Sequence, residues 1–255
     1  MPNLEELKET LEKEVKKRDS YFEVNKSNPD PILIARKYKD ERVVLICSLF
    51  SYGRASSIVN FLSSLDFSIL DYSEDRIKKE TKKFYYRFQN GKDLANIFIT
   101  LKRVLQHDSL ENIFYRGYKK EDCVIDGLSE LIGFLRKINS YDSRGYNFLI
   151  GKSPSKRRLN SSPYKRWNLF LRWMVRKDNI DLGLWKKVNK KDLIIPLDTH
   201  MFNVSKKIGL LNRKSYDLKA ALELTLNLKK FDPDDPVKYD FAIYRIGQQN
   251  IKIFN

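Results

Sequence analysis

The stretch that decides this fold opens with Ser162-Pro163-Tyr164-Lys165-Arg166-Trp167 and closes with Ile195-Pro196-Leu197-Asp198-Thr199-His200. Ser162 is a residue type that favours the N-cap of a helix, and Pro163 suits the first helical position. We therefore predict a helix from 163 to about 177. Asp198 is a good N-cap for a second helix, which begins directly after it.

Lys165 and Asp198 are 33 positions apart and would each lie at the start of a helix. The positive end of a helix dipole disfavours an ammonium ion and favours a carboxylate. A lysine that readily supplies a free amine, facing an ionised acid, is the pair that Schiff-base chemistry needs. The simpler alternatives are a solvated surface lysine and an aspartate that only caps its helix.

The rest of the chain predicts helices nearly everywhere, because apolar residues recur at spacings of three and four. Alternating patterns typical of strands are scarce, so the predicted fold class is all-α. Pro29-Asp30-Pro31 breaks the chain before Ile32, and 178–192 reads as a loop. Helices are predicted over 4–18, 41–52, 55–65, 93–106, 110–118, 124–138, 163–177, 199–208 (stopped by Gly209) and 235–246 (ended by Gly247).

The predicted helix 163–177 has two faces. Its apolar stripe consists of Trp167, Phe170, Leu171, Met174 and Val175, and its polar face of Lys165, Asn168, Arg172 and Arg176. The stripe indicates core packing, and the polar face is where function could lie. In the last helix, Asp240 and Tyr244 are one turn apart and therefore adjacent.

The charge balance favours a polyanionic partner. The chain has 49 Lys and Arg against 33 Asp and Glu, a net charge of +16. Neutralising phosphates with release of counterions drives nucleic-acid binding, so DNA or RNA is the simplest partner. The alternative is a compositional bias with a merely soluble surface.

Cysteine and histidine are too few for common metal centres. Cys47 and Cys123 lie beside apolar residues and read as core thiols rather than a disulfide. With only His107 and His200 besides, we expect no metal and no cofactor. The start of the chain does not resemble a secretion leader and no apolar run could span a membrane, so we expect a cytoplasmic, nucleoid-associated protein.

These residues resemble the helix-hairpin-helix DNA glycosylase superfamily. The run 195–200, followed by a basic helix to Lys206-Lys207-Ile208-Gly209-Leu210, is similar to its signature around a catalytic aspartate. The long separation of lysine and aspartate resembles the archaeal-type 8-oxoguanine DNA glycosylase branch. The run Lys165-Arg166-x-Asn168...Phe170-Leu171-Arg172-Trp173-Met174-Val175-Arg176 looks like an uncharacterised bacterial family of similar length. The usual Pro-Gly hairpin is absent here, replaced by Asn160-Ser161-Ser162-Pro163.

The resemblance implies roles for individual residues. Lys165 falls at the nucleophile and Asp198 at the catalytic carboxylate. The residues implied in the pocket for the flipped base are Asp240, Tyr244 (Trp in the archaeal branch), Tyr52, Arg172 (Lys there) and Leu169 (a stacking Phe there). Basic side chains expected at the DNA backbone are Lys156, Arg157, Arg158 and Arg166, with His200 near the second helix start.

The resemblance also implies an architecture and a reaction. We expect one glycosylase-like unit over 1–255, in which lobe A (32–192, a helical barrel) carries the lysine. Lobe B (1–31 plus 193–255) would carry the aspartate across a cleft. The expected activity is a monomeric bifunctional DNA glycosylase/AP lyase that flips a damaged base, 8-oxoguanine, out of duplex DNA.

Three other functions fit the same sequence. The chain could be a helical DNA- or RNA-binding protein without chemistry, which would bind in a salt-dependent manner without Lys165. It could be a glycosylase for another damaged base. It could also be a protein-interaction scaffold whose basic surface is incidental.

Overall fold

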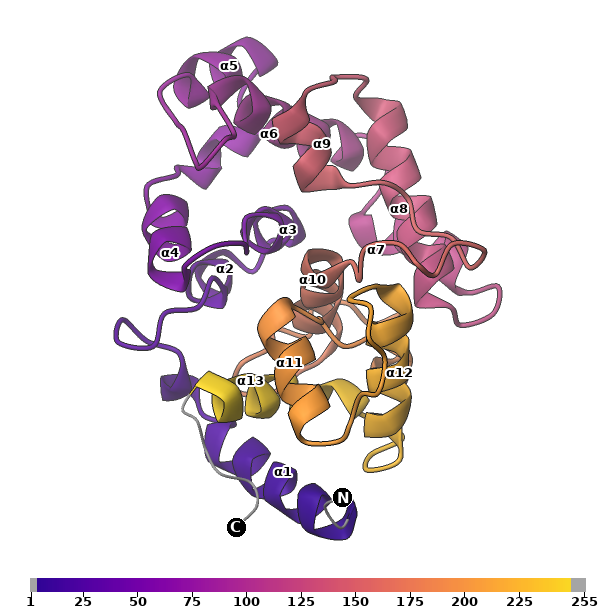
Figure 1. Cartoon of the computed structure of the whole chain (residues 1–255). Coiled ribbons are helices and arrows are strands. Elements are labelled where there is room, and N and C mark those ends of the chain that lie inside the picture. The colour runs from indigo at the N-terminus through magenta and orange to yellow at the C-terminus, as the bar shows by residue number, and fades with distance from the viewer. Residues whose placement is uncertain (1–3, 249–255) are drawn as a thin grey trace. The chain divides into compact units, whose positions relative to one another are not determined.

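The computed structural model describes residues 4–248, and over that range the chain forms α-helices and short 3₁₀ turns without a named strand (Figure 1). The predicted all-α class is confirmed. Two compact units are present. The central unit comprises residues 29–156, and the terminal unit combines residues 1–28 with residues 157–255.

The central unit is built around helices whose apolar faces are buried together. Helix α3 is enclosed on all sides, since every residue from Val43 to Leu49 is buried. A reciprocal capping box between Asn90 and Asp93 starts helix α6. The helices are α2 (Ile32–Tyr38), α3 (Glu41–Leu49), α4 (Ala55–Ser63), α5 (Glu74–Thr81), α6 (Gly91–Leu105), α7 (Leu110–Tyr118), α8 (Val124–Ile138) and α9 (Arg144–Ile150).

The terminal unit joins the two ends of the chain. Helix α13 packs against α11 and α1, so the last helix of the sequence lies beside the first (Figure 1). The close approach of α11 and α13 depends on Gly247, since an added Cβ there would lie 2.2 Å from Val204. The helices are α1 (Leu4–Arg18), α10 (Lys165–Val175), α11 (Thr199–Lys207), α12 (Leu218–Lys229) and α13 (Asp240–Gln248).

Most predicted helices are confirmed, with changes at their ends. Gly209, at φ 77, follows α11 as expected. The last predicted helix is divided into a 3₁₀ turn, Pro236–Tyr239, and α13, which continues past Gly247. The helix predicted to reach Tyr52 ends at Leu49. Helices α2, α5, α9 and α12 were not predicted; three of them are only seven or eight residues long.

The expected division into lobes is wrong in one respect. Residues 157–192 belong to the terminal unit rather than to lobe A, so Lys165 and Asp198 lie in the same unit. The physical reason is the packing of α10 and the loop that follows it. Arg172 on α10 donates to Asp240, and Arg176 directly after α10 donates to Asp235 at 2.8 Å, so this segment is tied to the start of α13 and to the turn before it.

The two thiols are free. Cys47 is fully buried, as predicted, and its burial raises the pKa of the thiol. Cys123 is half-buried and lies at the N-cap of α8, so it is not a core residue. Among residues 4–248, no helix has the length and apolar character needed to cross a membrane.

Candidate active site

Helix α10 begins at Lys165 itself. Tyr164 is its N-cap, in a left-handed conformation with φ 52, and supplies no side-chain cap. The prediction that Ser162 caps this helix and Pro163 starts it is therefore wrong. The preceding segment is held by the next helix instead, because the first amides of α12, Leu218 and Lys219, donate to backbone carbonyls at residues 161 and 159, at 2.9 and 3.1 Å.

Asp198 caps helix α11 as predicted. Its side chain accepts a hydrogen bond from the backbone N–H of Met201 at 2.8 Å, and its own backbone is extended. The carboxylate is half-buried. Tyr216 lies close by and donates its hydroxyl to the carbonyl of Leu197 at 2.9 Å. Burial, together with the negative charge of Asp198, raises the pKa of Tyr216.

Asp240 lies at the centre of the predicted site. It is the first residue of α13 and is 7% exposed. Burial raises the pKa of Asp240 to about 6; Arg172 opposes this rise, Asp198 adds to it and Lys165 opposes it. The structure thus brings Lys165, Asp198 and Arg172 within electrostatic reach of one buried carboxylate.

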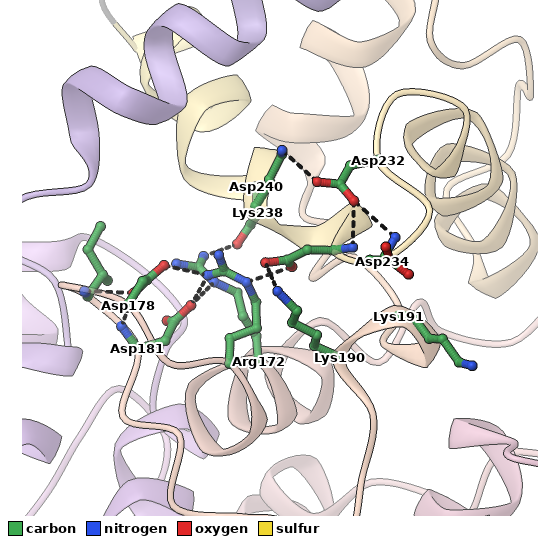
Figure 2. Close-up of polar contacts among 12 residues, drawn as sticks. Arg172, Asp178, Asp181, Lys190, Lys191, Asp232, Asp234, Lys238 and Asp240 are labelled. Carbon is green, nitrogen blue, oxygen red and sulfur yellow. Dashed lines mark hydrogen bonds and ion pairs between the residues drawn. The ribbon is translucent and has the colours of Figure 1, made fainter.

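Arg172, on the predicted polar face, is buried and belongs to a network of ion pairs (Figure 2). Arg176 is buried as well and shares Asp181 with it. Arg172 donates to Asp181 at 3.1 Å and also to Asp240. Arg176 donates to Asp235 at 2.8 Å and to Asp181. We use the name buried ion network for Arg172, Arg176, Asp178, Asp181, Asp235 and Asp240.

The loop after α10 supplies two acids of the buried ion network that sequence reasoning missed. Asp178 accepts from Arg176 at 2.7 Å and from the backbone N–H groups of Ile180 and Asp181 at 2.7 and 2.6 Å. Although burial acts to raise it, the pKa of Asp178 is lowered, because Arg176 and these backbone donors favour the charged form. For Asp181, burial outweighs the arginines and raises the pKa.

A sequence signal for this network was present. Arg172 and Arg176 lie four positions apart beside a strong apolar stripe, and arginines that such a helix buries need partners, since a buried charge is costly unless it is paired. Asp178 and Asp181 follow within five residues of Arg176. The third partner, Asp235, is remote in sequence and also accepts from Lys190 at 3.3 Å.

His200 and Tyr244 contact one another across α11 and α13. The Nε2 atom of His200 lies 3.3 Å from the carbonyl oxygen of Tyr244, and their rings meet edge to face at 5.5 Å. Tyr244 is half-buried, one turn after Asp240. The predicted adjacency of Asp240 and Tyr244 therefore holds along the helix, whereas His200 packs against α13 with its ring.

The remaining predicted residues divide between the units. Leu169 is buried on α10, and Arg166 is half-buried beside the start of that helix. Tyr52 belongs to the central unit, where its ring packs against Phe148 at 4.8 Å.

The three predicted basic residues around the unit boundary are exposed. Lys156 ends the central unit, and Arg157 and Arg158 begin the second segment of the terminal unit. Lys156 pairs with Asp126 at 2.7 Å and with Glu121 at 2.5 Å, and these hydrogen bonds raise its pKa. A phosphate would have to compete with two carboxylates for this ammonium group.

The side chains that the structure describes bear on the expectation that no metal is bound. Among them, no three His, Cys, Asp or Glu side chains are grouped so that they could hold a metal ion. The acids of the buried ion network face arginines instead.

A family model described as Protein of unknown function (DUF2400) matches residues 30–249, which is most of the chain. The chain therefore belongs to that family. No curated protein and no solved structure matches the chain.

Proposed function

We propose that this member of a family of unknown function is a base-excision DNA repair glycosylase with AP lyase activity, which removes 8-oxoguanine through a Schiff base on Lys165. The observation that carries this proposal is the electrostatic action of both Lys165 and Asp198 on the buried carboxylate of Asp240. Lys165 begins α10, Asp198 caps α11 and Asp240 begins α13, so the three residues come from parts of the chain that are far apart in sequence.

The reaction begins when the target nucleotide is flipped out of the duplex, because the sugar and base are unreachable in the stack. The amine of Lys165 attacks the anomeric carbon of the sugar, forming a C–N bond while the glycosidic bond breaks. The base leaves with the electron pair of that bond and takes up a proton. Opening of the sugar ring then gives a protonated imine.

Asp198 has two roles in this scheme. Its carboxylate stabilises the positive charge that develops on the sugar, and it accepts the proton that the attacking amine must lose. The imine then acidifies the neighbouring C2′–H. Loss of that proton and departure of the 3′ phosphate cleave the strand by β-elimination. None of these steps requires a metal or an organic cofactor.

The proposed base pocket is lined by Asp240, Tyr244, Arg172 and Leu169. Asp240, with its pKa near 6, supplies a carboxyl group that can hydrogen-bond a base edge in either protonation state. Arg172 orients this group, since it donates to it directly. The half-buried ring of Tyr244 offers an aromatic face for stacking.

Duplex DNA is the proposed partner. Its phosphates would be bound by the basic side chains Arg157, Arg158, Arg166 and Lys156. Contacts to phosphates position DNA without reading its sequence. We propose that the protein acts as a monomer in the cytoplasm, where it meets the nucleoid.

A second candidate is a DNA- or RNA-binding protein without catalysis. The observation that favours it is the pairing of Arg172 with Asp240, which satisfies both groups inside the fold without a ligand. A glycosylase for a different damaged base is a variant of the first proposal and differs only in what the pocket accepts.

The test is borohydride trapping on a duplex containing 8-oxoguanine opposite cytosine, beside an abasic duplex and an undamaged duplex. Wild-type protein is compared with Lys165→Gln and with Lys207→Gln, an exposed lysine at the end of α11. We expect a covalent adduct on both damaged duplexes that is lost only in Lys165→Gln.

Other outcomes identify the alternatives. An adduct on the abasic duplex alone would support the lyase and overturn 8-oxoguanine, and a panel of damaged bases would then find the substrate. Tight, salt-dependent binding without any adduct would favour the non-catalytic candidate. If the protein shows no preference for duplex DNA, a protein-interaction scaffold would be the remaining interpretation.

A further inference from the structure

Three aromatic rings of the central unit gather at its surface. Phe88 and Phe148 are 36% and 39% exposed, and their centroids are 4.9 Å apart. Tyr52, which is half-buried, packs against Phe148 at 4.8 Å and against Phe88 at 6.2 Å. Clustered rings of this kind offer a flat apolar surface to a ligand.

Two arginines complete what we call the aromatic face: Tyr52, Phe88, Phe148, Arg87 and Arg144. The guanidinium of Arg87 lies 5.5 Å from the ring centre of Tyr52, and that of Arg144 lies 5.4 Å from the ring centre of Phe88. Among the described residues neither arginine pairs with a carboxylate, whereas the buried arginines of this protein do. Their charge is therefore available to an anion.

A hydrogen-bonded turn carries Arg87 and Phe88 of the aromatic face. Tyr86 and Gln89 exchange two backbone hydrogen bonds of 2.9 Å, so Arg87 and Phe88 form the tip of a two-residue turn. Arg87 takes the left-handed conformation that such a tip requires, with φ 58. Phe88 is thus presented at the tip of a hydrogen-bonded turn.

Gln89 ties the three segments of the face together. Its side chain is 1% exposed, accepts a hydrogen bond from the hydroxyl of Tyr52, and donates to the carbonyl of Gly145 in α9. The hydroxyl of Tyr86 donates to the carbonyl of Tyr52 at 2.8 Å. Helix α9, which carries Arg144 and Phe148, also packs against α6 (Figure 1).

We propose that the aromatic face binds unstacked bases of a DNA strand. A base presents a flat π-face that stacks on Phe88 or Phe148, and such stacking tolerates any sequence. Arg87 and Arg144, which lie over the rings of Tyr52 and Phe88, supply positive charge for the phosphates that accompany the bases. A chain of net charge +16 adds a general attraction for such a strand.

The positive charge of Arg87 and Arg144 disfavours an apolar protein as the partner of the aromatic face. Docking of a hydrophobic helix or of a second copy would bring two unpaired guanidinium groups against an apolar or equally basic surface, and would leave them without counter-charge. A polyanion with flat apolar rings satisfies both parts of the face at once.

This inference does not rest on the proposed lyase chemistry. The face contains none of Lys165, Asp198 and Asp240, and it belongs to the other unit. Binding of an undamaged strand can therefore be measured in the Lys165→Gln protein, where the lysine mechanism is absent. Failure of one proposal leaves the other standing.

The experiment is fluorescence anisotropy with labelled, undamaged DNA. The probes are a short oligothymidine, a duplex with two unpaired central thymidines, and a fully paired duplex of the same length. The variants are Phe88→Ala, Phe148→Ala, their combination, and Phe88→Trp, which retains a stacking ring. The matched control is Phe22→Ala, a phenylalanine in the terminal unit that is 79% exposed.

We expect the combined variant to bind the two probes with unpaired bases about tenfold or more weakly, and the paired duplex nearly as well as wild type. Phe22→Ala and Phe88→Trp should bind like wild type. Circular dichroism and thermal melting establish that each variant is folded. We expect folded variants because both rings are exposed and contribute little to the core.

Three results would overturn the proposal. The first is binding of the combined variant equal to that of wild type on every probe, and the second is a loss of the same size on the paired duplex. The third is a concentration-dependent dimer in sedimentation that Phe148→Ala dissociates, since the face would then join two copies of the chain.

Discussion

The guanidinium of Arg172 donates to the carboxylate of Asp240 although 68 positions of sequence separate them, and both side chains are buried. Arg172 is held in place by Asp181, which also accepts from Arg176. One buried acid thus fixes two arginines, and through Arg172 it fixes the acid at the centre of the candidate active site.

Replacing Asp181 by Asn should destabilise the protein by about 3–5 kcal/mol, because two buried arginines then lose their shared counter-charge. Urea unfolding followed by circular dichroism measures this change. Asp234→Asn, an exposed acid near the same network, is the control and should change the free energy of unfolding by less than about 0.5 kcal/mol. Equal stability of the two variants would mean that the buried ion network does not hold the terminal unit together.

Asp240 should make stability fall as pH rises from about 4 to about 7. Its pKa is raised from the ordinary value of 3.8 to about 6 by burial, so the folded protein holds a proton that the unfolded chain has lost. This stabilisation is fully present below pH 3.8 and is lost as the pH rises through about 6. Its size is on the order of 3 kcal/mol.

The measurement compares wild type with Asp240→Asn by urea unfolding across this pH range. As the pH rises, the unfolding free energy of wild type should fall relative to that of Asp240→Asn. A difference that stays constant would show that Asp240 does not titrate there. Asp234→Asn should follow wild type at every pH.

Asp198 has a structural role and a proposed chemical role that two substitutions separate. Asp198→Ala removes the cap of α11 and should cost about 0.5–2 kcal/mol of stability. Asp198→Asn keeps a capping side chain and should melt close to wild type, yet it should lose most of the borohydride adduct because it has no negative charge. Full trapping by Asp198→Asn would restrict this residue to capping.

Gly247 and Gly133 form a matched pair of helical glycines with opposite surroundings. A Cβ at position 247 would lie 2.2 Å from Val204 and 2.6 Å from Nε2 of His200, so Gly247→Ala should destabilise the protein by about 1–3 kcal/mol. At Gly133 the nearest atom is 3.8 Å away, and Gly133→Ala should stabilise α8 by about 0.5–1 kcal/mol. Differential scanning calorimetry compares both with wild type, and a gain in both variants would contradict close packing of α11 on α13.

The longest helices could be predicted from sequence because their apolar spacing is sustained. Those over Leu4–Arg18 and Val124–Ile138 have the predicted bounds. Short helices such as Glu74–Thr81 escaped prediction, since seven or eight residues carry too few turns for a periodic signal. The start of the helix at Lys165 was missed for another reason, because backbone contacts from a remote helix override the local capping preference of Ser162.

Local sequence patterns were enough to predict the all-α class, most helices, the capping role of Asp198 and the adjacency of Asp240 and Tyr244. These follow from local spacing and from the chemistry of one or two neighbouring residues. Tertiary structure alone decided that Lys165 and Asp198 share one unit, that Asp181 and Asp235 neutralise Arg172 and Arg176, and that Tyr52 joins an exposed aromatic face. Pairing between residues far apart in the chain depends on which surfaces the helices bury against one another, and no local pattern contains that information.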